Sequence, residues 1–134
     1  MAVKFVNTIV FVSDLAESKR FYSDLLGIKV KEELESIIFF ENHLVLHSDK
    51  PILDSVFKTE SKSRLNPIGA NNILIYFECE SLSELESTFG KVSSKAKVIH
   101  EIEVQDWGQK VFRFFDPDGH ILEFGLKNGL NEKT

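Results

Sequence analysis

A lone carboxylate interrupts an apolar run near the C-terminal end of the chain. Glu123 stands within HILEFGL, and Asp116-Pro117-Asp118-Gly119 separates this run from VFRFF, which contains Arg113. In a cavity, Glu123 could ligate a metal, act as a general base, or receive a cationic group of a ligand. The alternatives are an ion pair with Arg113 across a hairpin, or exposure to water. Arg113 in an apolar strand needs a charged partner or a ligand anion.

Two asparagines hold matching positions, each just before or at the start of an apolar run. Asn7 begins NTIVFV and Asn72 begins NILIYF. Two amides at equivalent places could orient one polar ligand, or each could simply be bonded to backbone. None of the four histidines is spaced from another as metal ligands are, and no pair resembles a nucleophile and its base.

The secondary-structure elements that position these residues form an internal repeat. Residues 7–30 and 71–92 each read as an apolar strand, a polar hinge and an amphipathic helix that ends at a glycine. Asp14 and Ser81 are predicted N-caps, each followed three residues later by a glutamate. Three strand-like segments follow each helix, so each half predicts a β-α-β-β-β order. The glycines expected to end the helices are Gly27 and Gly90.

Strand alternation indicates which side chains share a face. The uniformly apolar faces suit a covering helix, and the mixed faces suit the wall of a cavity with a few placed polar groups. Trp107 is either an aromatic flap over a ligand or an anchor in a dimer interface. The residues predicted to contact a ligand on these mixed faces are Asn7, Phe11, His47, Asn72, Tyr76, Glu78, Trp107 and Arg113, with Glu123 as the candidate catalytic residue.

Size and composition predict one globular domain of 134 residues with 43% hydrophobic content. The net charge of −5 argues against a nucleic-acid partner, because phosphate binding needs a concentrated positive surface. The N-terminal residues lack the pattern of a signal peptide and the length of a membrane span. Cys79 is the single cysteine, so no internal disulfide exists and a cytoplasmic location is expected. The expected boundaries are 1–48 and 71–127 for the two modules, 49–70 for a connector containing a helical turn, and 128–134 for a loose tail.

The paired modules, the phrase VSDLAESKRFYSDLLGIKV and the phrase FRFFDPDGHILEFG resemble the vicinal-oxygen-chelate superfamily. This superfamily includes glyoxalase I, bleomycin-resistance proteins, fosfomycin-resistance enzymes and extradiol dioxygenases. The resemblance extends from about residue 3 to 126, and WGQKV before the turn is similar to a subgroup of small uncharacterised members. It implies an α+β fold of two βαβββ modules forming a half-barrel cleft, and a homodimer.

The resemblance also implies four positions for the ligands of a divalent metal. These fall on Asn7, on or near Val45, on Asn72 and on Glu123, and only Glu123 matches the family pattern. His47, two residues after Val45, is the nearest substitute. Two amides and one carboxylate make a weak site for a transition metal.

The first expectation is therefore a protein that binds a small, partly apolar ligand without a catalytic metal or other cofactor. The second is a metal-dependent lyase, isomerase or dioxygenase with an atypical site of Asn7, His47, Asn72 and Glu123, where the metal acts as a Lewis acid. A third is a structural or regulatory dimer with a filled interior. The superfamily hosts many reactions, so the fold does not name a ligand.

Overall fold

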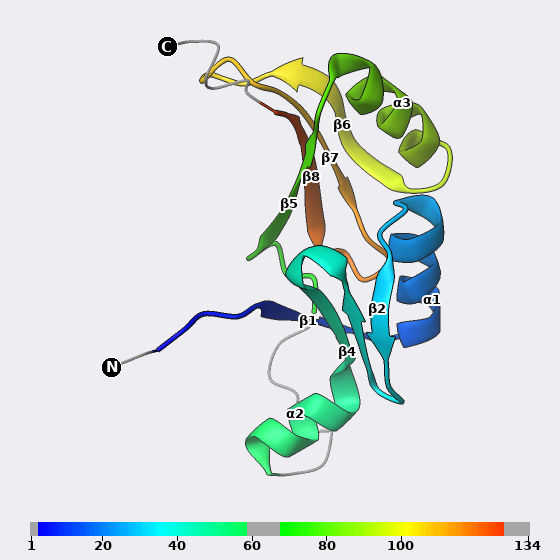
Figure 1. The fold of residues 1–134 in the computed structure, drawn as a ribbon, viewed down its shortest axis with the longest axis vertical. Helices are drawn as coiled ribbons and strands as arrows, with labels where there is room; N and C mark the ends of the chain where they lie inside the picture. Colours follow the sequence, from blue (N-terminus) through cyan, green and yellow to red (C-terminus); the bar gives the residue numbers. More distant parts are fainter. Residues whose placement is uncertain (1–2, 59–67, 128–134) are drawn as a thin grey trace. The chain divides into compact units, whose positions relative to one another are not determined.

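The structure is a computed structural model that describes residues 3–58 and 68–127. The chain forms two compact units, residues 1–68 and 69–134. Each unit contains one open, four-stranded mixed sheet (Figure 1). The predicted α+β class and the repeated β-α-β-β-β order are confirmed, while the predicted tail, 128–134, lies outside the described residues.

The first sheet has the strand order β1-β4-β3-β2, with β1 parallel to β4 and the other neighbours antiparallel. Its elements are β1 (Thr8–Val12), α1 (Leu15–Lys19), the π-helical turn η1 (Arg20–Leu25), β2 (Val30–Glu33), β3 (Ile37–Phe40), the short turn η2 (Glu41–His43), β4 (Leu44–Ser48) and α2 (Asp49–Phe57). α2 is longer than the helical turn expected in the connector.

The second sheet repeats this plan with the order β5-β8-β7-β6, and β5 is parallel to β8. Its elements are β5 (Leu74–Cys79), α3 (Leu82–Ser93), β6 (Lys97–Val104), β7 (Lys110–Phe115) and β8 (Ile121–Leu126). None of the helices in the described ranges is both long and apolar enough to cross a membrane.

Both predicted N-caps are present. The backbone N–H of Glu17 donates to Asp14 Oδ1 at 3.0 Å, and that of Glu84 donates to Ser81 Oγ at 3.2 Å. Each bond satisfies an N–H that has no partner within its helix. Gly27 follows η1 with a φ of 75°, so the prediction that a left-handed glycine ends the first helical segment is confirmed.

The prediction that Gly90 ends the second helix is wrong, because α3 continues to Ser93. Leu85 and Val92, seven residues apart and therefore on the same helical face, are both fully buried. Burial of Val92 favours another helical turn and outweighs the weak helix propensity of glycine.

Apolar residues on one face of each sheet form its core. In the first unit, Tyr22 of η1 is fully buried and its ring lies 6.1 Å from that of Phe40. In the second unit, α3 covers one face of the sheet (Figure 1), and that face carries a cluster of phenylalanine rings. The rings are those of Phe77, Phe89, Phe112, Phe114 and Phe124, with neighbouring centroids 4.9–5.7 Å apart. Much of the phenylalanine surplus therefore belongs to the core.

The turn between β7 and β8 fixes the register of these strands. Asp116 Oδ1 accepts hydrogen bonds from the N–H groups of Asp118 and His120, both at 2.9 Å. Gly119 supplies a φ of 86°. An aspartate that bonds the backbone two residues on is a common way to stabilise such a turn. As a result, Arg113 lies directly opposite Glu123.

Candidate functional site

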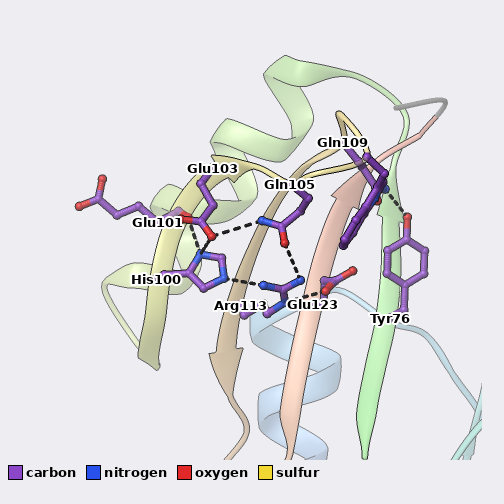
Figure 2. Close-up of polar contacts among 9 residues, drawn as sticks. Tyr76, His100, Glu101, Glu103, Gln105, Gln109, Arg113 and Glu123 are labelled. Carbon is purple, nitrogen blue, oxygen red and sulfur yellow. Dashed lines mark hydrogen bonds and ion pairs between the residues drawn. The ribbon is translucent and has the colours of Figure 1, made fainter. Parts of the chain in front are cut away.

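One row of side chains crosses all four strands of the second sheet. Cα pairing aligns Tyr76 of β5 with Glu123 of β8, Glu123 with Arg113 of β7, and Arg113 with His100 of β6. Figure 2 shows these four side chains on the same face of the sheet. Alternation directs them away from the phenylalanine core. The register thus gathers a phenol, a carboxylate, a guanidinium and an imidazole.

Arg113 is the centre of this row. Its Nε donates to Glu123 Oε1 at 2.6 Å, its Nη1 contacts His100 Nε2 at 3.0 Å, and its Nη2 donates to Gln105 Oε1 at 3.1 Å (Figure 2). The side chains of Arg113 and Glu123 are 22% and 10% exposed. A guanidinium has five N–H groups, so two remain for another acceptor. The ion pair is the alternative that the sequence left open for Glu123.

The contact with Arg113 indicates which tautomer of His100 fits this arrangement. A guanidinium only donates, so His100 Nε2 must accept and the proton must lie on Nδ1. Nδ1 is 2.7 Å from the carbonyl oxygen of Glu101, which accepts that proton. Glu103 Oε1 lies 3.8 Å from the same nitrogen and accepts from Gln105 Nε2 at 3.2 Å. Contacts on both ring nitrogens thus fix the orientation of the imidazole.

Gln109 organises a second group of side chains on the same face. It is 7% exposed. Its Oε1 accepts from Trp107 Nε1 at 2.9 Å, and its Nε2 donates to Tyr76 Oη at 2.8 Å and to the Leu126 carbonyl at 3.1 Å. Tyr76 Oη in turn donates to Glu78 Oε2 at 3.2 Å. Three predicted ligand contacts, Tyr76, Glu78 and Trp107, are therefore connected through one amide.

The electrostatic environment of Tyr76 reflects both groups. Burial is the largest influence that raises the pKa of Tyr76, and the hydrogen bond from Gln109 opposes it. The negative charges of Glu78 and Glu123 raise the pKa further. Tyr76 thus remains a neutral hydrogen-bond donor and acceptor at physiological pH.

Three predicted site residues belong to the first unit. Asn7 is half-buried and lies one residue before β1. Phe11 and His47 are register partners in β1 and β4, so their side chains share a face. His47 Nδ1 contacts the Ser48 carbonyl at 3.0 Å, so this nitrogen carries the proton and Nε2 is an acceptor.

Asn72 does not join the row around Glu123. It is exposed and lies two residues before β5 begins, whereas Tyr76 is the residue opposite Glu123. Four residues of extended chain span about 13 Å. Asn72 and Glu123 therefore lie at different levels of the second sheet, and the shared role predicted for them stays a prediction.

The donors described around Glu123 do not suit the divalent metal that the family resemblance implies. Glu123 Oε1 already accepts from Arg113, whose fixed positive charge would repel a cation. Val45 has no donor atom in its side chain. Within residues 3–58 and 68–127, no three His, Cys, Asp or Glu side chains gather in a way that could hold a metal ion.

Four residues that build the site were not among the predicted site residues: His100, Gln105, Gln109 and Gly125. Gln105 and Gln109 flank the β6–β7 turn, and nothing in a turn sequence indicates that its amides fold back over the sheet. The phrase WGQKV contained a usable signal, because a glutamine beside an apolar strand needs a buried partner.

Comparison with known proteins agrees with this architecture. The Glyoxalase-like domain family matches residues 5–127. A protein of unknown function from Agrobacterium tumefaciens is 37% identical, with a TM-score of 0.85 and coverage of 95% of this chain and 96% of that chain. No curated protein gives a significant match.

More distant structures share the fold. The fosfomycin resistance protein FosX from Listeria monocytogenes is 14% identical, with a TM-score of 0.73 and complete coverage (100%) of both chains. Lactoylglutathione lyase from Agrobacterium tumefaciens is 17% identical, with a TM-score of 0.70 and 96% coverage of each chain. From the family match over nearly its whole length, the chain belongs to the glyoxalase-like family of the vicinal-oxygen-chelate superfamily.

Proposed function

We propose that this protein binds a small, partly apolar molecule on the open face of the β5-β8-β7-β6 sheet, without a catalytic metal. The ion pair of Arg113 with Glu123 is the observation that carries this proposal. Glu123 is the one residue that matches the metal-ligand pattern of the family. The guanidinium of Arg113 already binds its Oε1, the oxygen that a metal ion would otherwise use. The Arg113–Glu123 pair can instead form hydrogen bonds with a polar group of the ligand.

The remaining hydrogen-bonding capacity of the pair defines the polar end of the ligand. Arg113 retains two N–H donors after its three bonds, and Glu123 Oε2 can accept. A group that has both an acceptor and a donor at neutral pH, such as a primary amide, satisfies both residues. Charge-assisted bonds of this kind are stronger than bonds between neutral groups.

The apolar end of the ligand would contact the apolar row that lies next to the polar row. Leu74, Ile121 and Phe115 align across β5, β8 and β7. Each lies two residues along its strand from Tyr76, Glu123 or Arg113 and therefore on the same face. Leu74 and Tyr76 are 46% and 42% exposed. A few oriented polar groups among apolar side chains is the usual composition of a small-molecule site.

Binding of a fragment panel, followed by chemical-shift changes in two-dimensional NMR spectra, tests this proposal. Planar amides should shift the signals of β5, β7 and β8. In the Arg113→Met/Glu123→Leu double variant, their affinity should fall about tenfold or more, since each charge-assisted hydrogen bond contributes roughly 1.5–3 kcal/mol.

Arg20→Met is the matched control, because Arg20 is exposed in the other unit and should leave binding unchanged. Shifts confined to other surfaces, or equal affinity in the double variant and wild type, would contradict the proposed site. Binding that requires added zinc, nickel or manganese would favour the metal-dependent alternative, in which the lone pair of His47 Nε2 could ligate the metal.

We further propose that the protein is a cytoplasmic homodimer. The residues that lead into the edge strand β1 include Val3 and Phe5, which are 82% and 81% exposed. Large exposed apolar side chains beside an unpaired strand edge are typical of an association surface.

The single, buried and unpaired Cys79 supports a reducing compartment.

A further inference from the structure

Two partly exposed aromatic side chains of the second unit are held in place by hydrogen bonds to one buried glutamine, Gln109. Trp107 and Tyr76 are 41% and 42% exposed, whereas Gln109, which bonds to both, is 7% exposed. Trp107 lies in the turn between β6 and β7, and Tyr76 lies in β5 at the edge of the sheet. Gln109 therefore connects two rings from separate parts of the unit.

The partners of Gln109 leave its amide only one orientation. Trp107 Nε1 can only donate, so the amide oxygen must face it, and the Leu126 carbonyl can only accept, so the amide nitrogen must face that oxygen. The second N–H of the amide then donates to Tyr76 Oη. Rotation of the amide by 180° would place its N–H groups against Trp107 Nε1, which is also a donor. It would also place its oxygen against the Leu126 carbonyl, which is also an acceptor.

Gly125 provides the space for this arrangement. A Cβ at Gly125 would lie 2.5 Å from Gln109 Nε2, 2.9 Å from Tyr76 Cε1 and 3.0 Å from Tyr76 Oη. Gly125 has no positive φ, so its backbone conformation suits an alanine and the requirement is for space alone. The flexible ends of Gln109 and Tyr76 can move aside only by giving up their hydrogen bonds.

We propose that Gln109, with Gly125 beneath it, is a positioning residue that preorganises Trp107 and Tyr76 to receive a planar aromatic part of the ligand. This inference rests on the proposed function and adds the class of ligand. Rings fixed before binding lose little conformational entropy on binding, so their contacts with a planar group contribute directly to affinity. The row of Glu123 and Arg113 receives the polar substituent of the same molecule, since Tyr76 belongs to that row.

The unliganded protein gives the first test, because Trp107 is the single tryptophan and its indole N–H gives one NMR signal. Hydrogen exchange of this N–H should be slow in the wild type and much faster in Gln109→Leu. Gln109→Glu keeps an acceptor for Trp107 but loses the donor to Tyr76, so it should restore the protection in part. Equal exchange in all three proteins would overturn the positioning role.

Binding of two matched compounds gives the second test. 2-Naphthamide is planar and aromatic, and decahydronaphthalene-2-carboxamide has the same polar group on a saturated skeleton. Quenching and shift of Trp107 fluorescence should report wild-type binding of 2-naphthamide with an affinity about tenfold higher than that of the saturated compound. Gly125→Ala and Gln109→Leu should each lose most of that preference while the affinity for the saturated compound changes little.

Gly90→Ala is the matched control for Gly125→Ala, because a Cβ at Gly90 meets nothing within 4 Å. It should bind both compounds as the wild type does. Trp107→Phe, which keeps an aromatic ring but removes the N–H, is followed by NMR and should show an intermediate preference. It keeps the proposal testable if Gly125→Ala does not fold.

The outcomes separate this inference from the proposed function. If the wild type binds both amides equally at the Arg113 row, the aromatic preference is wrong and the proposed function stands. If it prefers 2-naphthamide but Gly125→Ala and Gln109→Leu retain the preference, the positioning role is wrong. If neither amide binds at the second sheet, both the inference and the proposed ligand class are wrong.

Discussion

Arg113 and Glu123 lie opposite each other in β7 and β8, and the Nε of Arg113 donates to Glu123 Oε1 across 2.6 Å. The carboxylate is only 10% exposed, so little water can reach it and the guanidinium of Arg113 compensates its negative charge. A buried charge without a partner costs far more free energy than an exposed one.

Removal of one partner of this pair should destabilise the protein more than removal of both. Arg113→Met is expected to lower the free energy of unfolding by about 3 kcal/mol, because Glu123 is left buried and unpaired. The double variant Arg113→Met/Glu123→Leu should recover most of this loss, since two apolar side chains fit the low-polarity surroundings. Urea unfolding of the single and double variants measures the coupling, and additive effects would show that the pair is not coupled.

Two glycines with similar backbone conformations should respond differently to alanine. Gly27 and Gly69 have φ values of 75° and 67°. A Cβ at Gly27 meets nothing within 4 Å, whereas one at Gly69 would lie 2.0 Å from the carbonyl oxygen of Asp118. Gly27→Ala should cost about 1–2 kcal/mol from the left-handed conformation alone.

Gly69→Ala should cost the same amount plus roughly 1–3 kcal/mol for displacing backbone of the β7–β8 turn. Gly90→Ala, in the interior of α3 with open space around it, is the control and should stabilise by about 0.5–1 kcal/mol. Thermal unfolding of the three variants ranks them. Equal losses for the variants at Gly27 and Gly69 would contradict the close approach to Asp118.

The thiol of Cys79 should make stability decrease at alkaline pH. Burial raises the pKa of Cys79 above its usual value of 9.0, and the charge of Glu84 adds to this shift. The folded state therefore holds the proton more tightly than the unfolded chain does. This contribution to stability is complete below pH 9.0 and is lost as the pH rises through the folded-state pKa.

Urea unfolding at pH 7 and at about pH 9.5 checks this sign, and Cys79→Ala should show a smaller decrease between the two conditions. Because Cys79 is the single cysteine, the rate of its reaction with a disulfide reagent gives a second readout. The native thiol should react more slowly than the thiol of the urea-unfolded chain at the same pH. A fast native reaction would show that Cys79 is accessible and ionised.

The proposed association predicts a native mass of about twice 15.3 kDa by light scattering. Phe5→Asp should shift the population toward the monomer, because a charge replaces an exposed ring on the residues that lead into β1. Val104→Asp is the control, since Val104 is 62% exposed in the other unit. A monomeric wild type, or equal effects of both substitutions, would contradict the assignment of this surface.

Sequence patterns predicted the fold well because they are local. Alternation in β8 and the helical spacing of α3 depend on residues a few positions apart, and the caps at Asp14 and Ser81 satisfy their own helices. The ending of α3 was mispredicted for a related reason. Burial of Val92, a tertiary effect, outweighed the local signal of Gly90.

The candidate site was harder to predict, because it depends on register between strands distant in the sequence. Nothing near Asn72 indicates that Tyr76, rather than Asn72, lies opposite Glu123. The Arg113 pairing was one of several open alternatives, and the turn chemistry of Asp116 decides among them. Gln109 and Gly125 could not be paired from sequence, since their relationship is a steric fit between neighbouring strands.

The metal content of the purified protein shows whether Glu123 holds a metal ion or pairs with Arg113 alone. Protein prepared without chelators or a histidine tag, and then dialysed, should contain far less than one equivalent of zinc, nickel, manganese or iron by elemental analysis. This result is expected because Arg113 already neutralises Glu123. A stoichiometric metal that resists dialysis, and that Glu123→Gln removes, would contradict the account.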